Sequence, residues 1–112
     1  MATIYKICPA AEWDAAVRAG IYRGSPVDLR DGYIHFSTAD QVAETAAKHF
    51  AGQVDLVLVA IDADALGSDL KWEASRGGAL FPHLYADLLV RAALWVKPLP
   101  LDRAGRHILP AL

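Results

Sequence analysis

The chain has 112 residues, a length that corresponds to one domain. Hydrophobic residues make up 54% of it and charged residues 21%, which supplies enough apolar side chains for a core and excludes a disordered chain. The formal net charge is −2, from 11 basic and 13 acidic residues. This balance argues against a broad surface for long nucleic acid, although it leaves room for a small basic pocket.

The cysteine content and the length of the apolar runs indicate where in the cell the protein is expected. Cys8 is the only cysteine, so neither an intrachain disulfide nor a cysteine zinc site can form. The first fourteen residues lack the pattern of a signal peptide, and the longest apolar run, residues 56–61, is far too short to span a bilayer. We therefore expect a cytoplasmic protein that does not enter a membrane.

The first third of the chain predicts a strand, a helix, a loop and a second strand. Residues 3–7, "TIYKI", alternate and carry β-branched and aromatic side chains, which is typical of a strand. Pro9 suits the first turn of a helix and Gly20 its end, so a helix is expected near residues 9–19. Residues 21–32 contain two glycines and a proline and indicate a loop, and "YIHFS" (33–37) indicates a strand.

A second helix is expected directly after that strand. Thr38 as N-cap, with Gln41 three residues later, matches a capping box, and Gly52 marks the end. The spacing predicts one apolar face, formed by Val42, Ala43, Ala46, Ala47 and Phe50.

The second half of the chain is rich in strand patterns. Residues 54–61, "VDLVLVAI", are typical of a central strand covered on both faces, and residues 70–73 indicate a short strand. Residues 62–67 and 74–78 indicate a turn and a flexible loop. Pro82 argues against a central strand throughout residues 79–88, whereas residues 89–96 indicate a last core strand before a proline-broken tail. This order predicts an α+β fold with two small, mostly antiparallel sheets and two helices.

Four polar residues stand where a purely structural sequence does not need them, namely His35, Ser37, Glu73 and His83. Each also has a structural explanation: a half-buried strand histidine, a helix-capping serine, a solvated glutamate, and a histidine that pairs with Tyr85 to close a turn. Alternation places Tyr33, His35 and Ser37 on one face of their strand and leaves the packing to the residues between them. That face is the expected wall of a cleft.

A metal site is not favoured by these spacings. His35, His49 and His83 lack the HxH or i, i+4 spacing that makes a metal prediction specific. Phosphate-loop, dinucleotide-binding and nucleophile-elbow motifs are also absent.

Residues 33–66 resemble the middle of the ADP-ribosyltransferase superfamily, and most closely the tRNA 2′-phosphotransferases. The resemblance is carried by His35-Phe36-Ser37, the following alanine-rich segment, Gly52, the apolar run to Ile61 and Asp62-Ala63. It implies a cleft between two packed sheets that holds NAD or an ADP-ribosylated group, with His35 on the strand that lines it. Two positions depart from the superfamily pattern: Lys6 stands where a histidine or arginine is frequent, and Glu73 precedes the glycine loop instead of following it.

The whole chain more specifically resembles a small bacterial family of uncharacterised proteins, DUF952. The matching segments are "IYKI" (4–7), "GYIHFS" (32–37), "WE" (72–73) and "LFPHLY" (80–85). Membership in this family implies no established reaction.

Three hypotheses about function follow. In the first, the protein is an enzyme that processes a nucleotide or an ADP-ribose-type ligand, with NAD as one candidate. In the second, the same pocket binds such a ligand, or a small anionic metabolite, without turnover; an interaction domain is a third alternative. His35 and His83 would act as general acid and base, and Glu73 would orient a histidine or bind a ribose hydroxyl. The remaining candidate ligand-binding residues are Lys6, Arg30, Ser37, Arg76 and Tyr85. The orientation of Glu73 discriminates the hypotheses, while the tail and the oligomeric state stay open.

Overall fold

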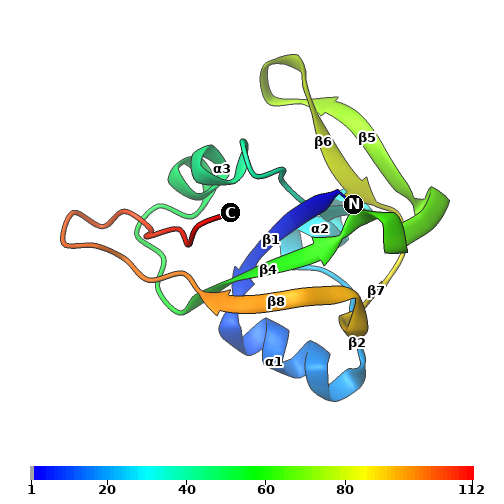
Figure 1. Cartoon of the computed structure of the whole chain (residues 1–112), viewed down its shortest axis with the longest axis horizontal. Coiled ribbons are helices and arrows are strands. Elements are labelled where there is room, and N and C mark those ends of the chain that lie inside the picture. Colours follow the sequence, from blue (N-terminus) through cyan, green and yellow to red (C-terminus); the bar gives the residue numbers. More distant parts are fainter. Residues whose placement is uncertain (1) are drawn as a thin grey trace.

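The fold is built on a central antiparallel sheet. The computed structural model describes residues 2–112, except for the side chain of Arg76. Across the middle of Figure 1 runs the sheet with strand order β1-β4-β8, made of β1 (Thr3–Pro9), β4 (Leu56–Asp62) and β8 (Ala93–Pro98). β4 is buried on both faces, as its continuous apolar sequence predicts.

Two smaller sheets flank it. One has the order β3-β6-β5 and consists of β3 (Ile34–His35), β6 (Ala79–Leu84) and β5 (Leu70–Ser75); the other pairs β2 (Ile21–Tyr22) with β7 (Leu88–Leu89). The β5–β6 hairpin extends away from the central sheet in Figure 1. Every strand pair of residues 2–112 is antiparallel.

Three α-helices and three 3₁₀ segments complete the fold. The α-helices are α1 (Ala10–Ala19), α2 (Pro26–Asp31) and α3 (Val42–His49). The 3₁₀ segments are η1 (Ala63–Asp69), η2 (Arg76–Gly78) and η3 (Val90–Ala92). The predicted α+β class with antiparallel sheets is confirmed, while the numbers of sheets and helices in the described residues exceed the prediction.

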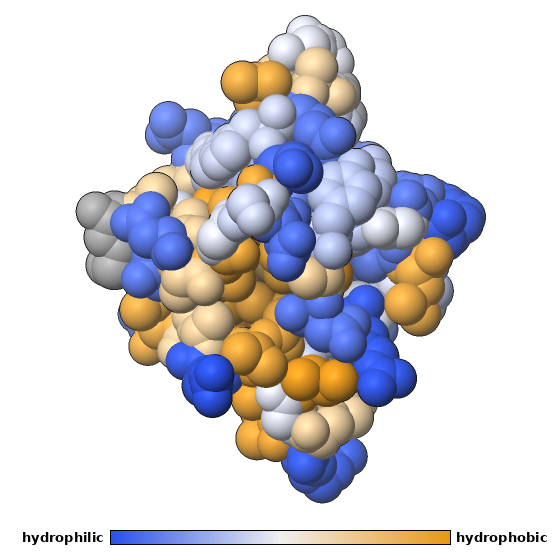
Figure 2. All heavy atoms as spheres, turned by 90° about the vertical axis from the view of Figure 1, so that its right-hand side faces the viewer, coloured by the Kyte–Doolittle hydropathy of each residue, from blue (hydrophilic) through white to orange (hydrophobic). Residues whose placement is uncertain are grey.

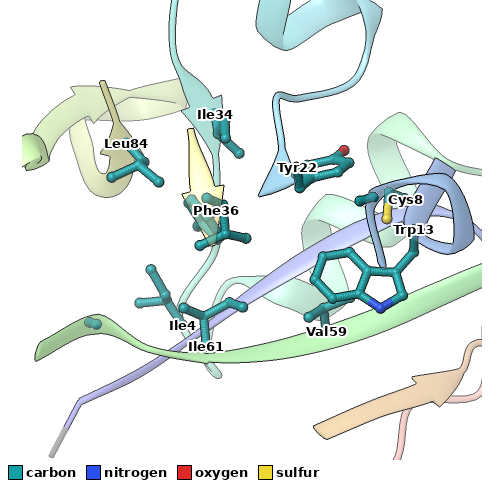
Figure 3. Close-up of a cluster of buried hydrophobic side chains, with 12 residues drawn as sticks. Ile4, Cys8, Trp13, Tyr22, Ile34, Phe36, Val59, Ile61 and Leu84 are labelled. Carbon is teal, nitrogen blue, oxygen red and sulfur yellow. The ribbon is translucent and has the colours of Figure 1, made fainter. Parts of the chain in front are cut away.

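The two faces of the central sheet form two cores because side chains of β1 alternate. Ile4 and Cys8 face one core with α1, Ile34 and Leu84, which Figure 3 shows gathered above β4. Tyr5 and Ile7 face the other core, which α3 covers with Val42 and Ala46. Lys6 lies between Ile4 and Cys8 and therefore points its buried side chain into the first core, where its charge requires a partner.

Two predictions about the first half of the chain are wrong. Residues 21–32, predicted as a loop, contain both β2 and α2. The helix expected after Thr38 begins only at Val42, although Gln41 does accept a hydrogen bond from the Thr38 backbone N–H. Ala43 and Ala47 of its predicted apolar face are exposed, since the core contacts only the side of α3 that carries Val42 and Ala46.

Residues 79–88 are not a central strand throughout, as predicted, because β6 ends at Leu84; Pro82 is nevertheless inside β6, the middle strand of its sheet, so the proline is not what ends it. The pairing of β3 with β6 ends at His35–His83, and beyond it the Pro82 carbonyl still accepts a hydrogen bond from the Phe36 N–H. In an antiparallel ladder the N–H and C=O of one residue point to the same neighbour. The donor that proline lacks would therefore point to Phe36, just beyond β3, so the ladder lacks only the reciprocal bond to the Phe36 carbonyl.

The side of the molecule that holds β5, η1 and β7 carries apolar side chains in its middle, with hydrophilic ones above and below (Figure 2). Large exposed apolar residues of this region include Trp72 and Leu89. No helix within residues 2–112 is long and apolar enough to cross a membrane.

Candidate functional site

Polar and aromatic side chains gather on one face of the β3-β6-β5 sheet. His35 of β3 lies directly opposite His83 of β6, and alternation places Tyr33 and Tyr85 two residues away on the same face. The two segments, Tyr33-Ile34-His35 and His83-Leu84-Tyr85, are mirror images in sequence. Antiparallel pairing therefore sets histidine against histidine and tyrosine against tyrosine. The opposite face carries Ile34 and Leu84 into the core, as Figure 3 shows.

Four rings, which we call the ring cluster, are linked by contacts through Tyr33 and between the two histidines: Tyr33, His35, His83 and Tyr85. Tyr33 lies at the centre, with its ring centroid 4.6 Å from His35, 4.2 Å from His83 and 5.1 Å from Tyr85. The two imidazole centroids are 5.4 Å apart. Tilted and edge-on contacts at these distances are favourable between aromatic rings.

Glu73 of β5 binds one end of the ring cluster. Its Oε1 accepts hydrogen bonds from His83 Nδ1 at 2.8 Å and from the Tyr85 hydroxyl at 2.7 Å. The hydrogen bonds from Tyr85 and from His83 lower the pKa of Glu73, and the same contact with Glu73 raises the pKa of Tyr85 to about 12. An ionised carboxylate only accepts, so Nδ1 of His83 is the protonated nitrogen.

Asp28 of α2 binds His35, at the end of the ring cluster opposite Glu73. Its Oδ1 lies 2.6 Å from His35 Nδ1 and 3.1 Å from the His35 backbone N–H, while Oδ2 accepts from Lys6 Nζ at 2.7 Å and from the Ser25 N–H at 2.8 Å. Burial raises the pKa of Asp28, but the hydrogen bonds from His35 and Lys6 outweigh it and bring the pKa down to about 2. Lys6 thus finds the partner that its buried charge requires.

The position of Asp28 follows from the local sequence. Ser25 and Pro26 begin α2, and Asp28 is its third residue, where a carboxylate accepts from the N-cap backbone. Gly24 lies against it with φ +116°, and a Cβ there would come within 2.6 Å of the Asp28 Cβ. Gly32, with φ +87°, then ends α2 so that Tyr33 and β3 can follow immediately.

Asp31, the last residue of α2, contacts the remaining nitrogen of His35. Its Oδ2 lies 3.1 Å from His35 Nε2, and its Oδ1 accepts from Arg30 Nε at 3.2 Å. His35 therefore lies between two carboxylates, a buried one and a partly exposed one.

The structure brings together four of the predicted site residues, His35, His83, Glu73 and Tyr85, and connects Lys6 to them through Asp28. Ser37 does not join them: its buried hydroxyl lies 3.0 Å from that of Thr45 on α3, and its backbone pairs with Tyr5. β3 ends at His35, so the alternation of side chains between the two faces of the strand does not extend to Ser37. Arg30 extends into solvent beside Asp31, and the side chain of Arg76 lies outside the described part.

Sequence reasoning missed Asp28, Asp31 and Tyr33 as members of the site. The signal for Asp28 was present as Ser25-Pro26-x-Asp28, a helix start within the segment interpreted as a loop. Tyr33 had been placed on the face of His35, but its central position among the rings depends on the pairing of β3 with β6.

No group of three or more histidine, cysteine, aspartate or glutamate side chains is arranged to hold a metal ion in the part of the chain that the structure describes. Two hollows, of about 340 and 500 Å³, are lined by other residues, the first by Leu70 and Trp72 among others and the second by residues of α1 and β2. A ligand at the ring cluster would lie over this face and in neither hollow.

The model of one protein family, described as "Protein of unknown function (DUF952)", matches residues 7–96. The chain belongs to the DUF952 family. The match begins within β1, ends within β8 and includes every residue of the site except Lys6.

Solved structures of a relative have the same fold. The crystal structure of protein CC0527 from Caulobacter crescentus is 57% identical, with a TM-score of 0.92, over 95% of this chain and 93% of that one. Its solution NMR structure, also 57% identical, has a TM-score of 0.85 over 95% of this chain and 91% of that one. No curated protein matches this DUF952 chain.

Proposed function

We propose that this DUF952 protein binds a nucleotide or an ADP-ribose-type ligand over the ring cluster and acts on it by proton transfer. The observation that carries the proposal is the pairing of two histidines, each held by its own carboxylate, around a shared tyrosine. Imidazoles with fixed orientation are the usual donors and acceptors of protons near neutral pH.

The chemistry of the ring cluster suits the parts of such a ligand. Tyr33 and Tyr85 offer aromatic surface for a planar base, and stacking of a base on an aromatic side chain contributes about 1–3 kcal/mol. Glu73 is partly exposed and can accept from ribose hydroxyls as well as from the rings that it already binds. His35 and His83 supply polar atoms for the phosphate and for the reacting bond.

The catalytic hypothesis is favoured over a plain binding module by the direction of Glu73. Its carboxylate points at His83 and Tyr85, not away from them. A carboxylate that orients one imidazole, opposite a second imidazole oriented by Asp28, is an arrangement for acid–base work. The resemblance of residues 33–66 to the ADP-ribosyltransferase superfamily points to the same ligand class.

A thermal-shift panel with NAD, ADP-ribose, AMP and inorganic phosphate tests the proposal. A ligand present at a hundredfold over its dissociation constant should add about 2.7 kcal/mol of stability to the wild-type protein. His35→Ala and Tyr85→Ala should reduce the shift, whereas His107→Ala, on a half-buried histidine of the C-terminal hairpin, should not. The absence of a shift with all four compounds would overturn the proposal.

Turnover separates the enzyme from the binding module. Chromatography of NAD or ADP-ribose after incubation with the protein should reveal a new product that is lost in His83→Gln. A ligand that binds and is recovered unchanged, with every acceptor tried, would favour the non-catalytic module.

A further inference from the structure

His35 is the one side chain of the ring cluster whose two ring nitrogens both face carboxylates. Nδ1 lies 2.6 Å from Asp28 Oδ1, and Nε2 lies 3.1 Å from Asp31 Oδ2. Carboxylate oxygens accept, so Nδ1 donates to Asp28 and Nε2 donates to the partly exposed Asp31, an arrangement in which His35 is the imidazolium.

The two carboxylates differ in how firmly they are held. The Asp28 side chain is fully buried and accepts four hydrogen bonds. The Asp31 side chain is 31% exposed and ends a helix of six residues. Among the described side chains it binds, besides His35, only the exposed Arg30. Asp31 can therefore rotate into solvent, taking Arg30 along, while Asp28 cannot leave without unpairing a buried lysine.

We infer that His35 Nε2–H is the oxyanion-binding donor of the site, and that Asp31 occupies it until a phosphate oxygen of the ligand takes its place. The inference rests on the proposed function and adds to it the ligand group that His35 recognises and a built-in competitor. A phosphate carries more negative charge than a carboxylate and has more acceptor oxygens, so it can displace Asp31 from the same donor. Arg30 already pairs with Asp31 at 3.2 Å, so this carboxylate has a cation beside it that does not depend on His35.

The charges around His35 favour replacement of Asp31, and not of Asp28, by an incoming anion. Asp28 below it is balanced by Lys6 of β1, and the neighbouring rings are Tyr33 and His83. Asp31 is thus the carboxylate without a buried counter-charge, and its departure removes the repulsion that an incoming anion would meet.

The test is a calorimetric titration of AMP and of inorganic phosphate into wild type, Asp31→Asn and His35→Gln. Asp31→Asn should bind about two- to fivefold more tightly, the range expected when a partly exposed ion pair no longer competes. His35→Gln should bind at least tenfold more weakly. Asp87→Asn is the matched control, because it removes an exposed carboxylate that pairs with Arg23 and does not contact His35.

Equal gains in Asp31→Asn and Asp87→Asn would reduce the effect to net charge and overturn the inference, as would an unchanged or weaker affinity in Asp31→Asn. If the wild type binds AMP but Asp31→Asn binds it no more tightly, the proposed function stands and the role of Asp31 as a competitor is overturned. If no phosphate compound binds to any variant, both fail.

A second measurement does not depend on affinity. In ¹⁵N spectra of the histidine rings, Asp31→Asn without ligand should shift His35 Nε2 and leave Nδ1 nearly unchanged, and phosphate added to the wild type should shift the same Nε2. Phosphate binding that leaves this nitrogen unaffected would place the anion elsewhere and overturn the inference.

Discussion

Replacing Asp28 with asparagine should destabilise the protein strongly, because it removes the charge and retains the shape. The Lys6 ammonium would then remain buried without a counter-ion, since both side chains are at least 95% shielded from solvent. Breaking a buried pair from one side costs about 3–5 kcal/mol, out of a total stability of roughly 5–15 kcal/mol for a domain. At roughly 4–8 °C per kcal/mol, the midpoint of thermal unfolding should fall by more than about 12 °C.

Urea unfolding of Asp28→Asn, Lys6→Met and the double variant measures this cost and assigns it. Each single variant should lose several kcal/mol at an unchanged m value, whereas Lys6→Met/Asp28→Asn should recover more than half, because no unpaired charge remains. A loss below about 1 kcal/mol in Asp28→Asn would mean that Lys6 and Asp28 behave as an exposed ion pair. That result would refute the interpretation of Asp28 as a buried anchor of His35.

Three further predictions concern titration and reactivity. The pKa of Asp28 is about 2, below the value of about 3.9 in an unfolded chain. The ionised Asp28 therefore stabilises the fold fully above about pH 3.9, and this contribution is lost as the pH falls through 2. The free energy of unfolding should decline by about 2 kcal/mol over this range in the wild type and not in Asp28→Asn. Glu73→Ala removes the acceptor that raises the pKa of Tyr85 to about 12, so tyrosinate absorbance should appear nearer pH 10, with Tyr85→Phe identifying the signal. Burial raises the pKa of the Cys8 thiol to about 12, so a thiol reagent at pH 8 should modify Cys8 only after denaturation, and rapid labelling of the folded protein would contradict its burial.

The part of the site that lies on strands could be predicted from the sequence, because alternation along a strand is a local rule. His35 and His83 stood out as polar residues within apolar segments, and Tyr85 follows His83 by two residues. Glu73 stood out as the carboxylate that ends residues 70–73 before the glycine loop. What the sequence does not contain is the register that places His35 opposite His83. That register arises from long-range pairing, which a single sequence does not encode in any short pattern.

The part contributed by α2 was lost for a different reason. A helix of six residues, between two glycines and with a proline at its start, has too few turns for a periodic pattern. Its Asp28 is defined by tertiary contacts with Lys6 and His35, 22 and 7 residues away. Ser37 is the opposite case, a residue that was predicted in the site and lies outside it. The alternation that placed it beside His35 stops where β3 ends.

A lysine in the middle of β1 is an expensive way to fill a core. An apolar side chain of similar volume would pack there without desolvating a charge, and such replacements are often neutral or stabilising. Lys6 and Asp28 are therefore poorly explained by stability alone. Their geometry accounts for them better: Lys6 holds one oxygen of Asp28, which leaves the other oxygen to fix both the backbone and the ring of His35. A two-residue strand such as β3 has few contacts of its own with which to hold a ring in place, and the buried pair supplies that rigidity where the proposed chemistry needs it.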